Sequence, residues 1–134
     1  MRVIFGLKDF YEIDEWVVEA HCAAHQSDLA WLNSQVSRIS AEEPHRKIVV
    51  FTHHSPVTRD SRAVHPRLVN SPVSSGFATD LSAQECWTNL SVRLWAFGHT
   101  YYNVNYVEDS GKMVLSNQRR YYSPQANEDL VVDI

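Results

Sequence analysis

The amino-acid sequence predicts an α/β domain in which strands and helices form layers. Two short runs, residues 47–52 and 92–97, are mostly apolar and rich in β-branched and aromatic residues, which is typical of strands buried on both faces. Segments that read as helices lie before and between them, and this alternation predicts a sheet covered by helices. The chain has 134 residues, 44% of them hydrophobic, so a single domain spanning residues 1–134 is expected.

The first half of the chain is expected to hold one strand and one long helix. Residues 2–7 form a short apolar run that predicts a strand, whereas residues 8–24 are mixed in character and predict no element. A helix is predicted to open at residues 26–28 and to end at Pro44. Its apolar residues recur at helical spacing and are Leu29, Leu32, Val36 and Ile39.

The second half of the chain is expected to hold a long loop, a short helix and a hairpin. Residues 57–80 are rich in Pro, Ser and Arg, and a loop of that length in a compact domain is usually functional or disordered. Residues 81–89 predict the helix. Residues 101–107 and 112–117 flank the turn sequence Glu-Asp-Ser-Gly, which predicts a β-hairpin.

Charge and composition argue against several classes of function. The formal net charge is −4 with no run of Lys or Arg, so nucleic acid and anionic membranes are not expected partners. No run approaches the roughly 20 apolar residues of a membrane span, and nothing resembles a signal peptide, so the cytoplasm is the expected compartment. Cys22 and Cys86 form no metal motif and are expected to be small buried side chains.

Histidines follow both of the predicted buried strands. Residues 53–56 read His-His-Ser-Pro, and Gly98 and His99 follow the second strand. Ligands gather at the carboxyl ends of strands in α/β sheets, and neutral imidazole is a good ligand for Zn, Mn or Fe. Neighbouring strands would bring both imidazoles to one ion, and Gly98 would permit a close backbone approach. A hydrogen-bonded structural role for each histidine is the alternative, and spacing alone leaves both open.

The same two segments resemble elements of the calcineurin-like metallophosphoesterases. Residues 54–56, His-Ser-Pro, resemble the H-x-P element of that family, and residues 98–100, Gly-His-Thr, resemble the start of its G-H-x-H element. Further segments resemble one large branch of the family, and they are residues 24–32, 76–81, 86–87 and 116–119. The similarity extends from about Phe5 to Tyr122. It implies a partial fold, the C-terminal half of a two-sheet αββα sandwich.

The resemblance implies hydrolysis of phosphomonoesters or phosphodiesters by two divalent metal ions. Such ions clamp the phosphate and lower the pKa of the attacking water. The resemblance further implies that His54 and His99 ligate the second ion, which would be Mn, Zn or Fe. His53 would support the site or contact the substrate, and it would replace His54 as a ligand if the register of the two differs. A phosphoester is the implied partner.

Two departures from the family pattern predict an incomplete metal site. The chain contains no D-x-H, no G-D and no G-N-H, the elements that supply most ligands of the first ion. Tyr101 stands where the family has the last histidine of G-H-x-H, and a phenol with a pKa near 10 is a poor ligand. Tyr101 is therefore expected to support the site or contact substrate. The chain is expected to be a truncated or degenerate copy that is inactive alone, with a non-catalytic binding domain as the alternative.

Other features of the sequence are weaker. His21 and His25 are four residues apart, which suits a metal on a helix, but ordinary surface histidines are the favoured interpretation because no Glu completes an HExxH motif. Arg119 and Arg120 could meet phosphate but are expected at an exposed hairpin end. Because a partial sandwich lacks neighbours for its strands, an exposed apolar face or edge is also expected.

Overall fold

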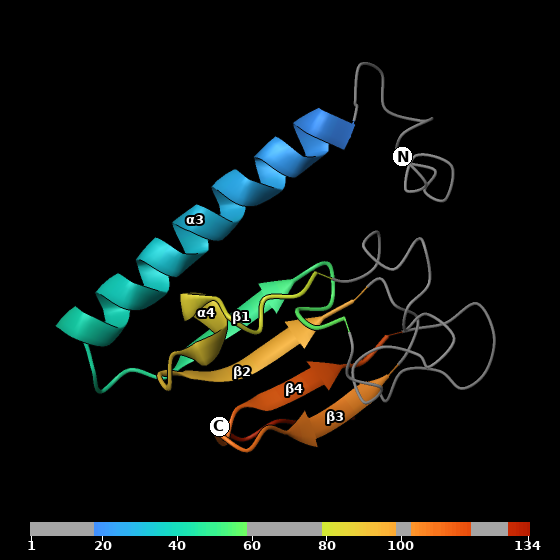
Figure 1. Cartoon of the computed structure of the whole chain (residues 1–134). Helices are drawn as coiled ribbons and strands as arrows, with labels where there is room; N and C mark the ends of the chain where they lie inside the picture. The colour runs from blue at the N-terminus through green and yellow to red at the C-terminus, as the bar shows by residue number, and fades with distance from the viewer. Residues whose placement is uncertain (1–17, 59–78, 99–102, 119–128) are drawn as a thin grey trace.

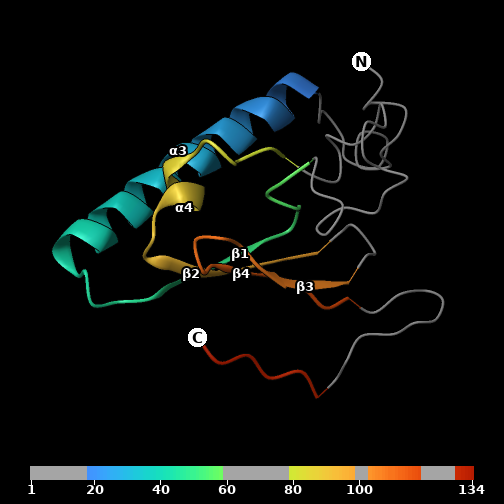
Figure 2. The same cartoon turned by 60° about the horizontal axis from the view of Figure 1, so that its bottom comes forward.

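A computed structural model describes residues 18–58, 79–98, 103–118 and 129–134 (Figure 1). The elements in chain order are α3 (Val18–Glu42), β1 (Ile48–Thr52), α4 (Glu85–Thr88), β2 (Val92–Phe97), β3 (Val104–Val107) and β4 (Met113–Ser116). The strands form one sheet in the order β1-β2-β4-β3, and both helices lie on the same side of it (Figure 2). The α/β class predicted from the sequence is therefore confirmed.

The sheet is mixed, and three of its strands run in the same direction. β1 pairs with β2 in parallel, β2 pairs with β4 in parallel, and β3 pairs with β4 in the antiparallel sense. The carboxyl ends of β1, β2 and β4 consequently meet at one edge of the sheet. The predicted hairpin is β3-β4, where Glu108 N donates to Lys112 O at 2.8 Å. Gly111 has a φ of 89°, a conformation that L side chains rarely adopt.

The helix predicted from residue 26 begins earlier than expected. α3 starts at Val18 and has 25 residues, so it includes part of the stretch for which no element was predicted. Residues 18–25 contain no Gly or Pro and include three alanines, which favour helix even where the apolar periodicity is weak. The helix ends at Glu42, two residues before Pro44, in agreement with the predicted end.

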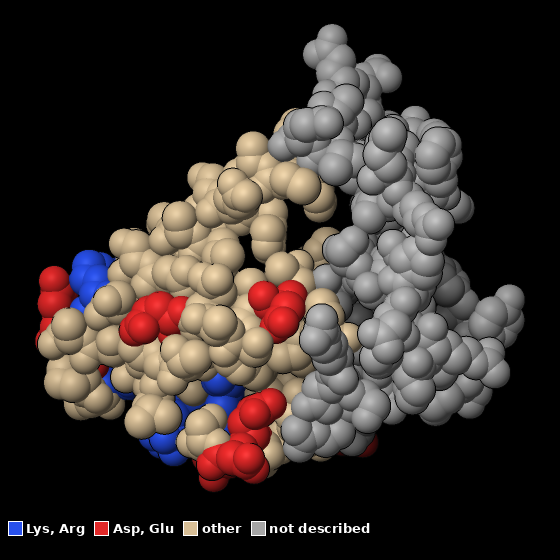
Figure 3. All heavy atoms as spheres, viewed as in Figure 1, with Lys and Arg blue, Asp and Glu red and all other residues tan. Residues whose placement is uncertain are grey.

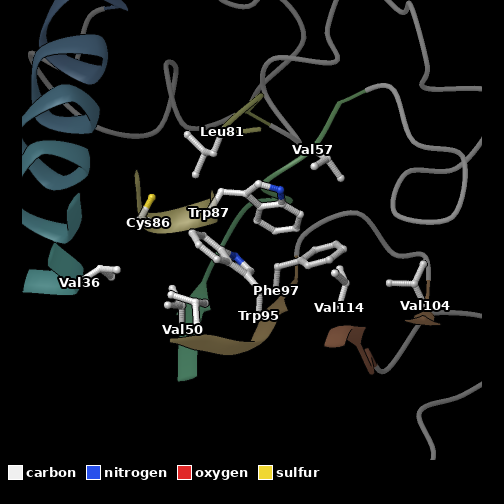
Figure 4. Packing of buried hydrophobic residues seen from close by; sticks show 11 residues of the cluster. Val36, Val50, Val57, Leu81, Cys86, Trp87, Trp95, Phe97, Val104 and Val114 are labelled. Carbon is white, nitrogen blue, oxygen red and sulfur yellow. The ribbon is translucent and has the colours of Figure 1, made fainter. Parts of the chain in front are cut away.

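The hydrophobic core lies between the sheet and the two helices. Trp95 and Trp87 are its centre, with ring centroids 5.4 Å apart and an interplanar angle of 59°. The ring of Phe97 and the side chains of Val50 and Val114 extend the core across the sheet (Figure 4). Val36 closes it from α3, and Cys86 closes it from α4. Cys86 is buried as predicted, whereas Cys22 is exposed, so the prediction for Cys22 was wrong.

The strand at residues 48–52 is not buried on both faces as its composition predicted. β1 is an edge strand of the described sheet, and Phe51 on it is 76% exposed. Val50 is buried because it faces the helices, and successive residues of a strand point to opposite faces. An exposed apolar face or edge was expected, and among the described residues of β1 Phe51 is the large hydrophobic side chain that is exposed. The second predicted buried strand, β2, has the predicted bounds and is mostly buried.

The C-terminal residues lie against the face of the sheet opposite the helices. Leu130 lines a cavity of about 260 Å³ together with Leu115 and Asn105, which belong to β4 and β3. Lys47 Nζ donates to Ile134 O at 2.7 Å, which joins the stretch 129–134 to the residue that precedes β1 (Figure 2). Leu130 therefore covers part of this face, whereas Val131 is exposed.

Several predictions fall outside the described residues. The strand at residues 2–7, most of the long loop and the two arginines at 119 and 120 are among them.

No helix in the described ranges is both long and apolar enough to span a membrane. On the face in Figure 3, acidic and basic side chains are scattered over the described surface, and two ion pairs, Arg38 with Glu42 and Arg46 with Glu43, bring opposite charges together.

A buried lysine joins the hairpin to α4. Lys112 is only 4% exposed, its Nζ lies 3.7 Å from the centroid of the Trp87 ring, and the same atom donates to Trp87 O. Burial lowers the pKa of Lys112, while the carboxylate of Glu108 raises it. Burial has the opposite effect on the Cys86 thiol and raises its pKa. The ammonium and the thiol therefore link the stability of the fold to pH in opposite directions.

The buried lysine should make the domain more stable in mild alkali. The ordinary pKa of lysine is 10.5, and the lowered value in the fold means that its stabilising contribution is complete above 10.5 and lost as pH falls through the folded value. Cys86 has the opposite effect on the free energy of unfolding, because the stabilising contribution of its protonated thiol is lost as pH rises above 9.0. We expect the free energy of unfolding of Cys86→Ala to rise as the pH is raised toward 10.5, measured by denaturant titration. Equal slopes for Cys86→Ala and Cys86→Ala/Lys112→Met would contradict this.

Candidate functional site

The two histidine-bearing segments are joined where β1 and β2 end. Gly98 N donates to His53 O at 3.1 Å, so the backbone that follows β2 is hydrogen-bonded to the backbone that follows β1. Parallel pairing produces this meeting because Thr52 and Phe97, the last residues of the two strands, are register partners. The carboxyl end of β4 lies at the same edge of the sheet and leads into Gln118.

The hydroxyl of Thr52 fixes the turn that carries the histidines. Trp95 Nε1 donates to Thr52 Oγ1 at 2.9 Å, and Thr52 Oγ1 donates to His54 O at 2.8 Å. The Trp95 side chain is fully buried in the core. The backbone of His54 is therefore tied through one hydroxyl to the centre of the fold, which restrains the position of its side chain.

The segment after His54 is held equally firmly. Ser55 is 1% exposed, and its Oγ donates to Val57 O at 2.9 Å. Thr79 N donates to Ser55 O, and Leu81 N donates to Pro56 O, both at 2.8 Å. These bonds explain why a Ser-Pro pair follows the histidines: the serine caps a buried turn, and the proline has no backbone N–H that would need a partner.

The two adjacent histidines differ in environment. His53 is exposed and His54 is half-buried, with ring centroids 4.9 Å apart and an interplanar angle of 53°. Both line the same cavity. This arrangement does not distinguish His54 from His53 as the expected ligand.

Among the described residues, none packs so closely on Gly98 that a glycine is required. A Cβ atom added to Gly98 would meet His53 O at 3.7 Å and Gln118 Oε1 at 4.0 Å, which are ordinary van der Waals separations. The contacts with described residues therefore give no sign of the close backbone approach that was expected here. The second contact is informative because it places the Gln118 side chain beside the end of β2. Gln118 is oriented by Asn103 Oδ1, which accepts from its backbone N at 2.6 Å.

A cavity of about 400 Å³ lies between α3 and the carboxyl end of β1. α4 separates α3 from the sheet, and polar bonds fix the spacing of the two helices: Asn33 Nδ2 donates to Gln84 Oε1 at 3.0 Å, and Cys86 N donates to Asn33 Oδ1 at 2.8 Å. The described lining from α3 is His25, Asp28, Leu29, Trp31 and Leu32, and the rest is Val50, Phe51, Thr52, His53, His54, Ser55, Thr79 and Leu81.

The α3 wall of this cavity was not identified from the sequence. His25 was interpreted as an ordinary surface histidine, but it is half-buried and lines the cavity. The signal was present, because His25, Leu29 and Leu32 are spaced at i, i+4 and i+7 and therefore share the face of α3 that is turned to the core. His21, its predicted pair, does not line the cavity in the described structure.

Of the two histidines expected to ligate an ion, the structure describes one, His54. His99 and Tyr101 lie outside them, so the distance between the imidazoles of His54 and His99 is not defined. Among the residues that are described, no group of three or more His, Cys, Asp or Glu side chains is placed to hold an ion. The donor at this edge of the sheet is imidazole nitrogen, which suits Zn, Mn or Fe, so the chemistry of His54 fits the ion expected there.

Comparisons of the chain with protein-family models, with curated proteins and with solved structures found no match.

Proposed function

We propose that the chain is a partial metal-dependent phosphoesterase domain of the calcineurin-like type. It binds one divalent ion and a phosphoester at the carboxyl ends of β1 and β2, and on its own it does not hydrolyse the ester. His54 and His99 are the ligands from this chain, and water completes the coordination. The roles proposed for His53 and Tyr101 are to support the ligands or to contact the phosphoester.

The hydrogen bond between Gly98 N and His53 O is the observation that supports this proposal most. It links the residue before His99 to the residue before His54, at the edge of the sheet where ligands of α/β domains gather. The hydrogen bond from Thr52 to the backbone of His54 adds support, because residues that ligate metals are commonly held in position by hydrogen bonds to neighbouring residues. The cavity beside His54 provides space for a substrate.

The expected lack of turnover follows from the ligands that the sequence does not contain. A water molecule activated between two ions needs a carboxylate bridge and a complete first-ion site, and D-x-H, G-D and G-N-H are absent from the chain. Two imidazoles alone fall short of the three protein ligands that are usual in catalytic zinc sites. We therefore expect binding without hydrolysis.

Ion binding tests the proposal directly. Titration of the chain with Mn²⁺ or Zn²⁺ should give weak binding by calorimetry, and His54→Ala should lower the affinity at least about tenfold because one of two ligands is lost. The affinity should fall as pH is lowered from about 7.5 to about 5.5, since protonated imidazole cannot ligate a metal. His45→Ala is the matched control because His45 is exposed and does not line the cavity.

Hydrolysis of 4-nitrophenyl phosphate should remain at the background rate with either ion. Tyr101→His should not create activity, because the other ligands of the first ion are still absent. Metal-dependent turnover that disappears in His99→Ala would contradict the expected lack of activity. Equal ion affinities of the wild type, His54→Ala and His45→Ala would contradict the assigned ligand.

A further inference from the structure

The cavity beside the histidines has a wall that the proposed phosphate chemistry does not use. Its volume of about 400 Å³ lies within the usual range of small-molecule sites, roughly 300–1,000 Å³. A phosphate group with its ion would need only part of that space. The remaining described lining is largely apolar and comes from both layers, with Leu29 and Leu32 on α3 and Val50 on β1.

Two large aromatic side chains of this wall are exposed although apolar surface is normally buried. Trp31 on α3 is 64% exposed, and Phe51 on β1 is 76% exposed. Both line the cavity, and they approach it from different secondary-structure elements. Exposed aromatic residues that share one cavity are characteristic of ligand sites, because planar ligands stack on such rings.

The cavity reaches around the outer edge of the sheet. Val50 and Phe51 are consecutive residues of β1, so their side chains point to opposite faces, yet both are part of the lining. Within the described residues no strand pairs with this edge of β1. A flat group in the cavity would lie along this edge, with Trp31 from α3 and Phe51 from β1 both in the lining.

The charges of the lining favour one orientation of such a ligand in the cavity. The α3 side holds the carboxylate of Asp28 as well as His25, and this carboxylate disfavours an anionic group there, whereas the β1 side holds His53 and His54 and no carboxylate among the described lining residues. The phosphate end of a ligand thus belongs at the end of β1. The apolar end belongs between Trp31 and Phe51.

We infer that this cavity is a subsite for the planar apolar group of an aryl phosphoester. The inference rests on the proposed function for the position of the phosphate, and it adds the chemical class of the ester. Trp31 and Phe51 contact the aryl group, and neither contacts the ion. Esters with a small polar alcohol, such as glycerol phosphate, leave the aromatic wall unused and bind less tightly.

Calorimetry with two phosphoesters tests the subsite. The wild-type chain, in Mn²⁺, should bind 1-naphthyl phosphate about tenfold more tightly than glycerol 2-phosphate. Trp31→Ala and Phe51→Ala should each remove most of that preference and leave the affinity for glycerol 2-phosphate unchanged. Because both side chains are largely exposed, both variants should fold.

Leu90→Ala is the matched control, since Leu90 is 69% exposed and is not part of the lining. It should keep the preference for the naphthyl ester. Equal affinities of the wild-type chain for the two esters would overturn the subsite, whatever the result of the ion titration. Binding of 1-naphthyl phosphate that depends on Trp31 but not on the ion would support the subsite and contradict the metal site of the proposed function.

Discussion

Replacing Trp95 by alanine should lower the free energy of unfolding by about 3–5 kcal/mol, the range for deleting a large buried aromatic side chain. Trp95 is fully buried at the centre of the core and stacks at a tilt against Trp87. Its indole also donates to Thr52, so the substitution removes packing and a hydrogen bond together. Domains of this size are stable by only about 5–15 kcal/mol, so the variant should unfold at a much lower denaturant concentration.

Denaturant titration followed by far-ultraviolet circular dichroism measures this loss. Trp31→Ala is the matched control because it deletes the same side chain from a largely exposed position, where the expected change is within about 0.5 kcal/mol. Trp95→Phe should fall between the two, since it keeps an aromatic ring in the core and lacks the indole N–H. A loss below about 1 kcal/mol for Trp95→Ala would contradict the central position of this residue.

The elements that the sequence predicted well are those whose signal is local. β2 has the predicted bounds because five of its six residues are apolar and it occupies the interior of the sheet. The β3-β4 hairpin follows from a turn that ends in Gly111 with a positive φ. Each of these signals is contained in a few consecutive residues, so no knowledge of distant parts of the chain is needed.

The predictions that failed depended on distant contacts. β1 has the composition of an interior strand, but its burial depends on a neighbour that composition cannot reveal, and Phe51 is exposed. Lys112 was expected only as part of a strand, because its burial comes from Trp87, which is 25 positions away. The cavity wall on α3 was missed for the same reason. The hydrogen bonds of Asn33 to Gln84 and Cys86 hold α3 against α4. The sequence of α3 alone does not reveal these bonds, nor the space that they leave between α3 and β1.

The candidate site was predicted to the extent that it follows from strand direction. Histidines after two apolar strands were expected at one edge of a sheet, and the bond between Gly98 and His53 joins the segments that carry them. The restraint on His54 could not be predicted, because it passes from the core through Trp95 and Thr52, which are 43 positions apart. The sequence therefore predicted which segments meet, and the structure adds what holds His54 in place.

The hydroxyl of Thr52 should therefore be important for both stability and ion binding. Thr52→Val keeps the shape of the side chain and removes the one atom that accepts from Trp95 Nε1 and donates to His54 O. Each of the two partly buried groups that lose a partner costs about 1–3 kcal/mol, so a total loss of about 2–6 kcal/mol is expected in the free energy of unfolding. The freed His54 should also bind Mn²⁺ or Zn²⁺ several-fold less tightly.

Thr52→Ser separates these effects from a change in packing, because it retains the hydroxyl and removes only a methyl group. This variant should keep the ion affinity of the wild-type chain and lose no more than about 1.5 kcal/mol of stability. Titration with the ion at a temperature where both variants are folded gives the comparison. Since a merely structural threonine would alter stability and leave the affinity of folded protein unchanged, equal ion affinities of Thr52→Val and Thr52→Ser would show that Thr52 does not position His54.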